Sequence, residues 1–363
     1  MRRRLLPALA AVLIAGGAAA QSTTVRGVVV DAESGRPVTG ANVFVSGAQT
    51  GDAADAGGAF SFTTDLPGTV TVAASAVGYE TASQEVDLDA APGGAVRLAF
   101  RLRPRTFETG EAVVVADRDG AWAQSLSVFT GLLLGETANA GRTTIENPEV
   151  LDFTRSDAGL RATAAVPLRL RNEGLGYELA LHNLDFEGDA EEVRWTAQTE
   201  FRPLPPDGRR QRRRWDQARR EAYAGSWTHF LRALQAGRAE REGFEVVEVD
   251  EVGYIIENPS PLSDPALAER LVRRDDGATV LVVPDVWLVA YTREDDRRAG
   301  PARRTGAFGE ADYPPQRSWI TTRSGGVEID GRGRERNRYG AVRYEYWTAE
   351  RAADLLPLDY DAD

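Results

Sequence analysis

Hydrophobic and polar positions alternate with a period of two along most of the first hundred residues. Val96, Leu98, Phe100 and Leu102 alternate with arginine and alanine, and the stretch from Thr69 to Ala74 repeats the pattern. Alternation of this kind buries one face of a strand and leaves the other in water. Turn residues such as Asp55-Ala56-Gly57-Gly58 separate these strands, and no helical pattern lies between them. The pattern predicts a β-sandwich of six or seven short strands.

Several short motifs within these strands resemble the carboxypeptidase regulatory-like (transthyretin-like) domain. They are Gly27-x-Val29-x-Asp31, Gly35-x-Pro37, Gly40-Ala41-x-Val43, Asp55-x-x-Gly58-x-Phe60 and Val77-Gly78-Tyr79. The resemblance implies a seven-stranded, non-catalytic sandwich over residues 21–103. It also implies an exported protein, because that family occurs in exported proteins, often ahead of outer-membrane transporters.

Residues 104–363 change to a mixed pattern. From Arg213 to Gln235, apolar residues cover most of the circumference at 100° per residue, which predicts one long helix packed on more than one side. A helix through Trp122 to Leu133 and a short one at Ala349 to Leu356 are also predicted. Strands are expected at Phe107–Ala116, Leu151–Phe153, Leu160–Leu170, Gly176–Phe186, Val193–Phe201, Phe244–Ile256, Thr279–Thr292, Ser318–Thr322 and Tyr339–Tyr346. We therefore expect a mostly β chain whose second part is an α+β domain, an antiparallel sheet around a central helix.

This second part also resembles the uncharacterised C-terminal region that follows the regulatory-like domain in some bacterial envelope proteins. The landmarks are Asn147-Pro148-Glu149-Val150-Leu151, Leu175-Gly176-Tyr177, Gly225-Ser226-x-x-His229-Phe230-Leu231 and Ala353-Asp354-Leu355-Leu356-Pro357. The resemblance supports a division into two domains and implies no activity.

The N-terminus has the pattern of a secretory signal. Three arginines precede an apolar run from Leu5 to Ala15, and Ala18-Ala19-Ala20 supplies small residues for cleavage. Residues 1–20 are therefore predicted to be a signal peptide, with export to the periplasm or the cell surface. No later segment is long and apolar enough to be a membrane-spanning helix.

Composition narrows the classes of partner. The chain contains no cysteine, which excludes disulfides, thiolate metal sites and a lipoprotein anchor. Its net charge of -12 argues against a nucleic acid partner. Five arginines between Arg209 and Arg214 therefore predict a solvated helix start, with an acidic partner surface as the alternative. Asp359 to Asp363 predicts a solvated tail.

Metal sites have little support in the sequence. His182 and His229 are the two histidines, whereas a zinc carboxypeptidase site needs His-x-x-Glu and a further histidine. Asp185 lies three residues after His182, but that spacing on a strand predicts opposite faces. Asp117-x-Asp119-Gly120 resembles the start of a calcium loop without its later ligands, so a turn is favoured. No cofactor is expected.

Ser226 and His229 are the alternative to a non-catalytic protein. Three residues apart on the predicted helix, they could touch and form the start of a hydrolase (esterase or peptidase) site. No Gly-x-Ser-x-Gly motif occurs, and both residues fall in the buried arc of the helix. Burial favours a role as hydrogen-bonded core groups.

Aromatic residues near the C-terminus are the best binding candidates. Tyr344 and Tyr346 are predicted to share one strand face, with Trp347 next to them and Trp195 on another strand. They either pack a core or form an exposed platform that stacks on sugar rings. Together these observations predict an exported, non-catalytic envelope protein that binds a protein or a glycan.

Overall fold

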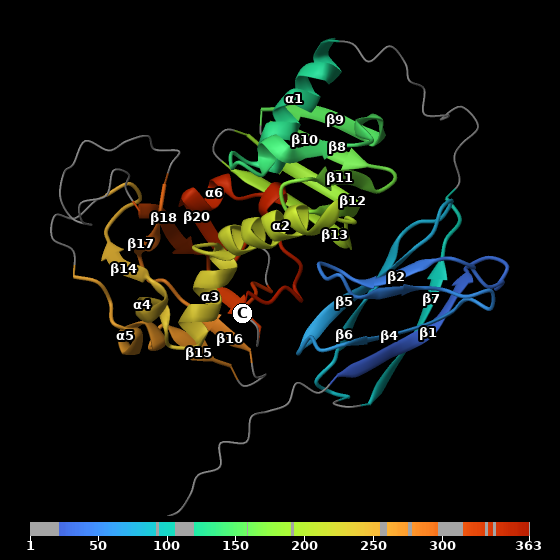
Figure 1. Cartoon of the computed structure of the whole chain (residues 1–363), viewed down its shortest axis with the longest axis horizontal. Coiled ribbons are helices and arrows are strands. Elements are labelled where there is room, and N and C mark those ends of the chain that lie inside the picture. Colours follow the sequence, from blue (N-terminus) through green and yellow to red (C-terminus); the bar gives the residue numbers. More distant parts are fainter. Residues whose placement is uncertain are drawn as a thin grey trace, which may run out of the picture.

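The first part of the chain is a seven-stranded β-sandwich, as predicted (Figure 1). The structure is a computed structural model that describes residues 22–91, 94–105, 120–157, 159–189, 192–254, 260–274, 278–296, 315–330, 333–336 and 339–362. One sheet has the order β4-β1-β7 and the other β3-β2-β5-β6. The strands are β1 (Thr23–Asp31), β2 (Asn42–Val45), β3 (Gly51–Ala53), β4 (Ala59–Thr64), β5 (Thr69–Ser75), β6 (Ala82–Asp87) and β7 (Ala95–Leu102).

The family motifs of the sandwich meet in space. The Asp31 carboxylate ends β1 and accepts hydrogen bonds from the Ser34 N–H at 2.7 Å and the Tyr79 hydroxyl at 3.0 Å. Gly27 lies where β1 pairs in parallel with β7, and a Cβ on it would lie 1.9 Å from the Leu98 carbonyl oxygen. Two motifs thus fix a turn and a strand junction, which explains why those residue types occur there.

A first core of the second part lies between one helix and a six-stranded antiparallel sheet. We call it core A; Phe129 and Leu133 of the helix and Leu179 and Phe186 of the sheet are fully buried in it. In Figure 1 the helix lies along these strands. The elements are α1 (Gly120–Leu134), β8 (Thr143–Ile145), β9 (Leu151–Ser156), β10 (Gly159–Ala164), β11 (Leu168–Asn172), β12 (Tyr177–Gly188) and β13 (Val193–Pro203), with 3-10 turns at Ala140–Arg142 and Pro148–Val150.

A second core, core B, surrounds a single buried helix. Phe230 and Leu231 of α3 are fully buried and pack with Phe244 and Trp287 of a four-stranded sheet of order β14-β17-β18-β20. The expected central helix is therefore α3. The elements are α3 (Trp227–Gln235), α4 (Ala239–Glu242), β14 (Phe244–Val249), α5 (Asp264–Ala268), β15 (Leu271–Arg273), β16 (Thr279–Leu281), β17 (Val286–Asp295), β18 (Pro315–Thr322), β19 (Val327–Ile329) and β20 (Ala341–Glu345).

The prediction of a single long helix from Arg213 to Gln235 is wrong. The chain forms α2 (Gly208–Tyr223) and then α3, with a break at Ala224-Gly225-Ser226. Gly225 has a φ of +72°, which favours glycine, and a Cβ there would lie 2.2 Å from Gln316 Oε1. The apolar pattern continues across this break because α2 buries residues before it and α3 buries residues after it.

The C-terminal end also differs from its prediction. Instead of a helix at 349–356, α6 (Tyr346–Ala349) is followed by the 3-10 helix η4 (Ala352–Asp354). The aspartate-rich end is not simply solvated. The Asp359 carboxylate accepts hydrogen bonds from the Gln49 N–H and the Thr50 hydroxyl, and the Leu358 N–H donates to the Gly47 carbonyl at 2.7 Å. The end of the chain is therefore bound to the sandwich.

The remaining predicted strands are found with different bounds: β9, β12, β13 and β18 are longer than predicted, whereas β14 and β20 are shorter. Leu160–Leu170 is divided into β10 and β11, and Thr279–Thr292 into β16 and β17. The strand predicted at Phe107–Ala116 lies outside the described residues. No helix among the described residues is long and apolar enough to cross a membrane.

Candidate functional site

A large hollow lies between core A and core B. We call it the aromatic cleft; its volume is about 600 Å³. Alternate residues of β13, including Trp195, form one wall, and Tyr344 of β20 with Trp347 of α6 form another. The C-terminal segment contributes Leu355 and Leu356. Strands that are about 150 residues apart in the sequence thus meet at one site.

Three of the four predicted aromatic residues line this cleft. Trp195 and Tyr344 are half-buried, whereas Trp347 is only 5% exposed and its indole N–H donates to the Gly225 carbonyl at 2.8 Å. Trp347 also packs on Trp227, with ring centroids 5.1 Å apart. These rings therefore pack against the cores and also line the cleft.

Tyr346 is the exception. Glu345 ends β20 with a φ of +62°, so the chain turns there and Tyr346 starts α6. The prediction that Tyr344 and Tyr346 share a strand face is wrong for this reason. The Tyr346 hydroxyl accepts a hydrogen bond from Gln316 Nε2 at 3.0 Å. Trp319, which sequence reasoning did not select, is the cross-strand partner of Tyr344 and lines the cleft instead.

Two carboxylates of the cleft are already engaged. Glu192 forms ion pairs with Arg194 and Arg323 at 2.7 Å each. Glu335 accepts hydrogen bonds from the Trp227 indole and from the Gly340 N–H, each at 3.1 Å. Because ionised groups with such partners hold fixed positions, these side chains shape the wall of the cleft.

Ser226 and His229 do not form a nucleophile–base pair. The Ser226 hydroxyl is the N-cap of α3 and accepts the backbone N–H of His229 at 3.2 Å. The His229 imidazole uses its own nitrogens elsewhere: Nδ1 accepts the Gly225 N–H at 3.0 Å, and Nε2 lies 2.9 Å from the Glu242 carboxylate. A general base must be hydrogen-bonded to the nucleophile's hydroxyl, and here the ring is saturated by other groups.

The surroundings of His229 keep the ring neutral. Burial lowers the pKa of His229, while the hydrogen bond to Glu242 opposes that shift. Because Nδ1 accepts a backbone N–H, the hydrogen of the neutral ring lies on Nε2 and is donated to Glu242. This arrangement is that of a structural core histidine.

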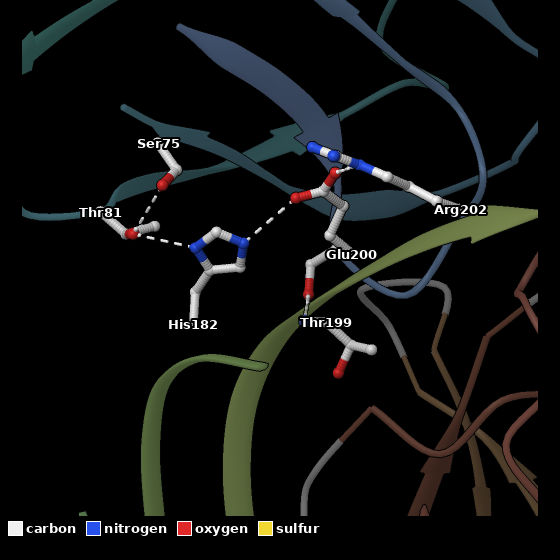
Figure 2. A network of polar contacts seen from close by, with 7 residues as sticks. Ser75, Thr81, His182, Thr199, Glu200 and Arg202 are labelled. Atoms are coloured by element: carbon white, nitrogen blue, oxygen red, sulfur yellow. Dashed lines mark hydrogen bonds and ion pairs between the residues drawn. The ribbon is translucent and has the colours of Figure 1, made fainter. Parts of the chain in front are cut away.

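His182 belongs to a polar network between core A's sheet and the sandwich (Figure 2). Its Nε2 lies 3.2 Å from the Glu200 carboxylate and its Nδ1 lies 3.1 Å from the Thr81 hydroxyl of the sandwich. Burial acts to raise the pKa of Glu200, but the hydrogen bond from His182 and the charge of Arg202 outweigh it, so that the pKa is lowered. Glu200 is thus ionised and accepts the Nε2–H.

The prediction that His182 and Asp185 lie on opposite faces of a strand is wrong. The strand register shifts between the two residues, and Asn183 has a φ of +50°. This β-bulge lets Leu181 and Leu184 both enter core A, so His182 and Asp185 both face away from it. Asp185 nevertheless pairs with Arg161 at 3.0 Å. His182, Asp185 and His229 are therefore not brought together, and no group that could hold a metal occurs among the described residues.

The other charged candidates are solvated or outside the structure. Arg209, Arg210 and Arg212 to Arg214 are exposed on the first turns of α2, as predicted. Asp117 and Asp119 lie outside the described residues.

The family comparison concerns the sandwich. The CarboxypepD_reg-like domain family matches residues 25–114. No curated protein matches the chain.

Comparison with solved structures gives distant likenesses. A minor pilin of Streptococcus agalactiae is 10% identical with a TM-score of 0.19, and the match covers 24% of this chain and 46% of the pilin. A putative carbohydrate binding protein of Bacteroides uniformis is 12% identical with a TM-score of 0.18, covering 50% of this chain and 79% of the other. Likenesses this weak carry no argument about function. The two packed sheets of the sandwich thus lie in the part of the chain that is similar to the CarboxypepD_reg-like domain family.

Proposed function

We propose that the protein is an exported, non-catalytic envelope protein that binds a protein or a glycan in the aromatic cleft. The observation that carries this proposal is the meeting of Trp195, Tyr344 and Trp347 in one hollow of about 600 Å³. Concave sites lined by aromatic side chains with a few polar groups are typical of ligand binding. The N-terminal pattern at residues 1–20 supports export.

The geometry of the chemistry-bearing residues supports the absence of turnover. Ser226 is used as a helix cap, and each histidine is held by a glutamate. The hydrolase alternative therefore lacks its central hydrogen bond. The arginines of α2 are solvated, and the net charge of -12 opposes a nucleic acid partner.

Binding by the purified protein to a glycan array and to a native envelope extract tests the proposal. Trp195→Ala and Tyr344→Ala are each expected to weaken binding about tenfold, which corresponds to about 1.4 kcal/mol, a value typical of a lost aromatic contact. Val77→Ala is the control, because Val77 is fully exposed on the sandwich. Unchanged binding by both cleft variants would contradict the proposal.

Export has its own test. Fractionation of the native cells is expected to place the protein, without residues 1–20, in the envelope or the medium. Recovery of the uncleaved chain from the cytoplasm would reject this part of the proposal.

A further inference from the structure

A second hollow adjoins the aromatic cleft and is lined by arginines. Its volume is about 200 Å³, and Arg232, Arg334, Arg343 and Arg351 line it. We call it the arginine pocket. Arg343, Trp347 and Arg351 line both hollows, so a ligand in the cleft can reach the pocket. Four cations around so small a space stand out in a chain whose net charge is -12.

Two of these arginines have no acidic partner among the described residues. Within that part of the chain, the Arg343 side chain forms no hydrogen bond or ion pair, and its guanidinium lies 5.5 Å from the centre of the Trp227 ring. Arg351 donates to the Thr348 and Leu132 carbonyls at 2.6 Å each and forms no ion pair with the described residues. Burial lowers the pKa of Arg351, with Glu136 opposing the shift. Both cations are therefore partly desolvated without a neutralising carboxylate from the described chain.

The other charges of the pocket do not cancel these two. Arg334 is neutralised by its ion pair with Asp330, and the Arg232 guanidinium lies over the Tyr223 ring. The acidic lining residues are Glu350 and Asp354. Asp354 accepts hydrogen bonds from Thr137 and Asn139, and burial raises its pKa. With Arg334 paired to Asp330, the three remaining arginines outnumber the two carboxylates, so the pocket retains an excess of positive charge.

A guanidinium is the side chain best suited to a carboxylate, because it donates two parallel hydrogen bonds. A partly buried cation attracts such a partner more strongly than an exposed one, because the local dielectric constant is lower. The flat rings of Trp195 and Tyr344 in the adjoining cleft suit stacking on a sugar ring. The two hollows together thus offer an apolar face and an anion site to the same ligand.

We propose that the ligand is an acidic saccharide of the uronic acid class, whose ring stacks in the aromatic cleft and whose carboxylate binds Arg343 and Arg351. This inference rests on the proposed binding function and narrows it to one ligand chemistry. The bulk negative charge of the protein repels anions over long range, so recognition depends on these short-range contacts.

Titration calorimetry with uronic acid oligosaccharides, each paired with its carboxyl-reduced neutral counterpart, tests the inference. The acidic member of at least one pair is expected to bind tenfold or more tightly than the neutral one. Arg343→Gln should abolish that difference, whereas Arg209→Gln, on exposed α2, should keep it. Arg343→Lys retains the charge without the paired donors and should fall between them. Equal thermal stability of the variants shows that they fold.

The outcomes separate the inference from the function on which it rests. Equal binding of acidic and neutral members, weakened by Trp195→Ala, overturns the inference and leaves the binding function standing. Binding of hexaglutamate with no binding of any saccharide overturns it in favour of an acidic protein ligand. If the unchanged protein bound no glycan and no envelope component, both the inference and the proposed binding function would be contradicted.

Discussion

The sandwich and the second part of the chain are held together in different ways. The sandwich has one core, and turns such as the one at Asp55 are closed by neighbours in sequence, since Asp55 Oδ1 accepts the Gly57 and Ala59 N–H groups at 2.8 and 2.9 Å. In the second part, Asp354 closes core A by accepting hydrogen bonds from Thr137 and Asn139, more than 200 residues earlier. Local closure places both partners within one short stretch of sequence, whereas distant closure leaves them in separate segments.

A glycine at a strand junction gives the largest expected effect. Gly27→Ala should destabilise the sandwich by about 4 kcal/mol, because its Cβ would lie 1.9 Å from the Leu98 carbonyl oxygen and force β1 and β7 apart. Urea denaturation followed by circular dichroism checks this. Gly57→Ala is the control, since its nearest contact is Asp55 Oδ1 at 3.3 Å. Equal stability of the two variants would refute the close approach of these strands.

The corresponding glycine of the second part lies between α2 and α3. Gly225→Ala is expected to cost about 3 kcal/mol, because it combines a positive φ with overpacking against Gln316 and Tyr291. Tryptophan fluorescence reports the unfolding of the second part of the chain and not of the sandwich, since all seven tryptophans follow residue 120. Gly237→Ala, with a φ of +60° and open space around it, should cost about 1 kcal/mol. A larger loss in the control would contradict the overpacking.

The contact between the two parts is tested at His182. His182→Ala is expected to cost about 2 kcal/mol, because it leaves buried Glu200 without one of its two side-chain donors and removes the packing on Phe44. The unfolding curves from circular dichroism and tryptophan fluorescence should then separate. Asp185→Asn, exposed on the same strand, should leave the curves together. Coincident curves in His182→Ala would argue against a stabilising role for this network.

The helix cap distinguishes structure from catalysis. Ser226→Ala should lower stability by about 1 kcal/mol through loss of the α3 cap. Ser226→Asp should restore it, because aspartate also caps helices. Hydrolysis of p-nitrophenyl acetate should be the same in both variants and in the unchanged protein. An esterase activity lost in both would revive the hydrolase alternative.

The smallest effect concerns pH. Because burial lowers the pKa of His229 below the 6.5 of an exposed histidine, the unfolded chain binds a proton first on acidification. The contribution of His229 to the free energy of unfolding is therefore fully present above about pH 6.5. It is lost as the pH falls toward the pKa of His229 in the folded protein. Thermal unfolding between pH 7.5 and 5.5 should show a decline that His229→Gln reduces. Acidic Glu242 and basic Arg232 and Arg293 modulate the size of the decline.

Only part of the candidate site could be predicted from the sequence. The sequence indicated Trp195, Tyr344 and Trp347 by residue type, and the structure places them in one cleft. It offered no signal for Trp319 or Arg343, because their importance depends on which groups lie beside them. Five exposed arginines of α2 stand out in the sequence, whereas the two pocket arginines without acidic partners in the described chain do not.

What the sequence determined by itself was local. Period-two alternation and turn motifs such as Asp55-x-x-Gly58 specify the sandwich, because strand faces and turns depend on neighbours in the chain. Only the tertiary structure decided that the helix breaks at Gly225, that the bulge at Asn183 places His182 and Asp185 on one side, and that β13 and β20 enclose a cleft. Those outcomes depend on contacts between distant segments, which no local pattern records.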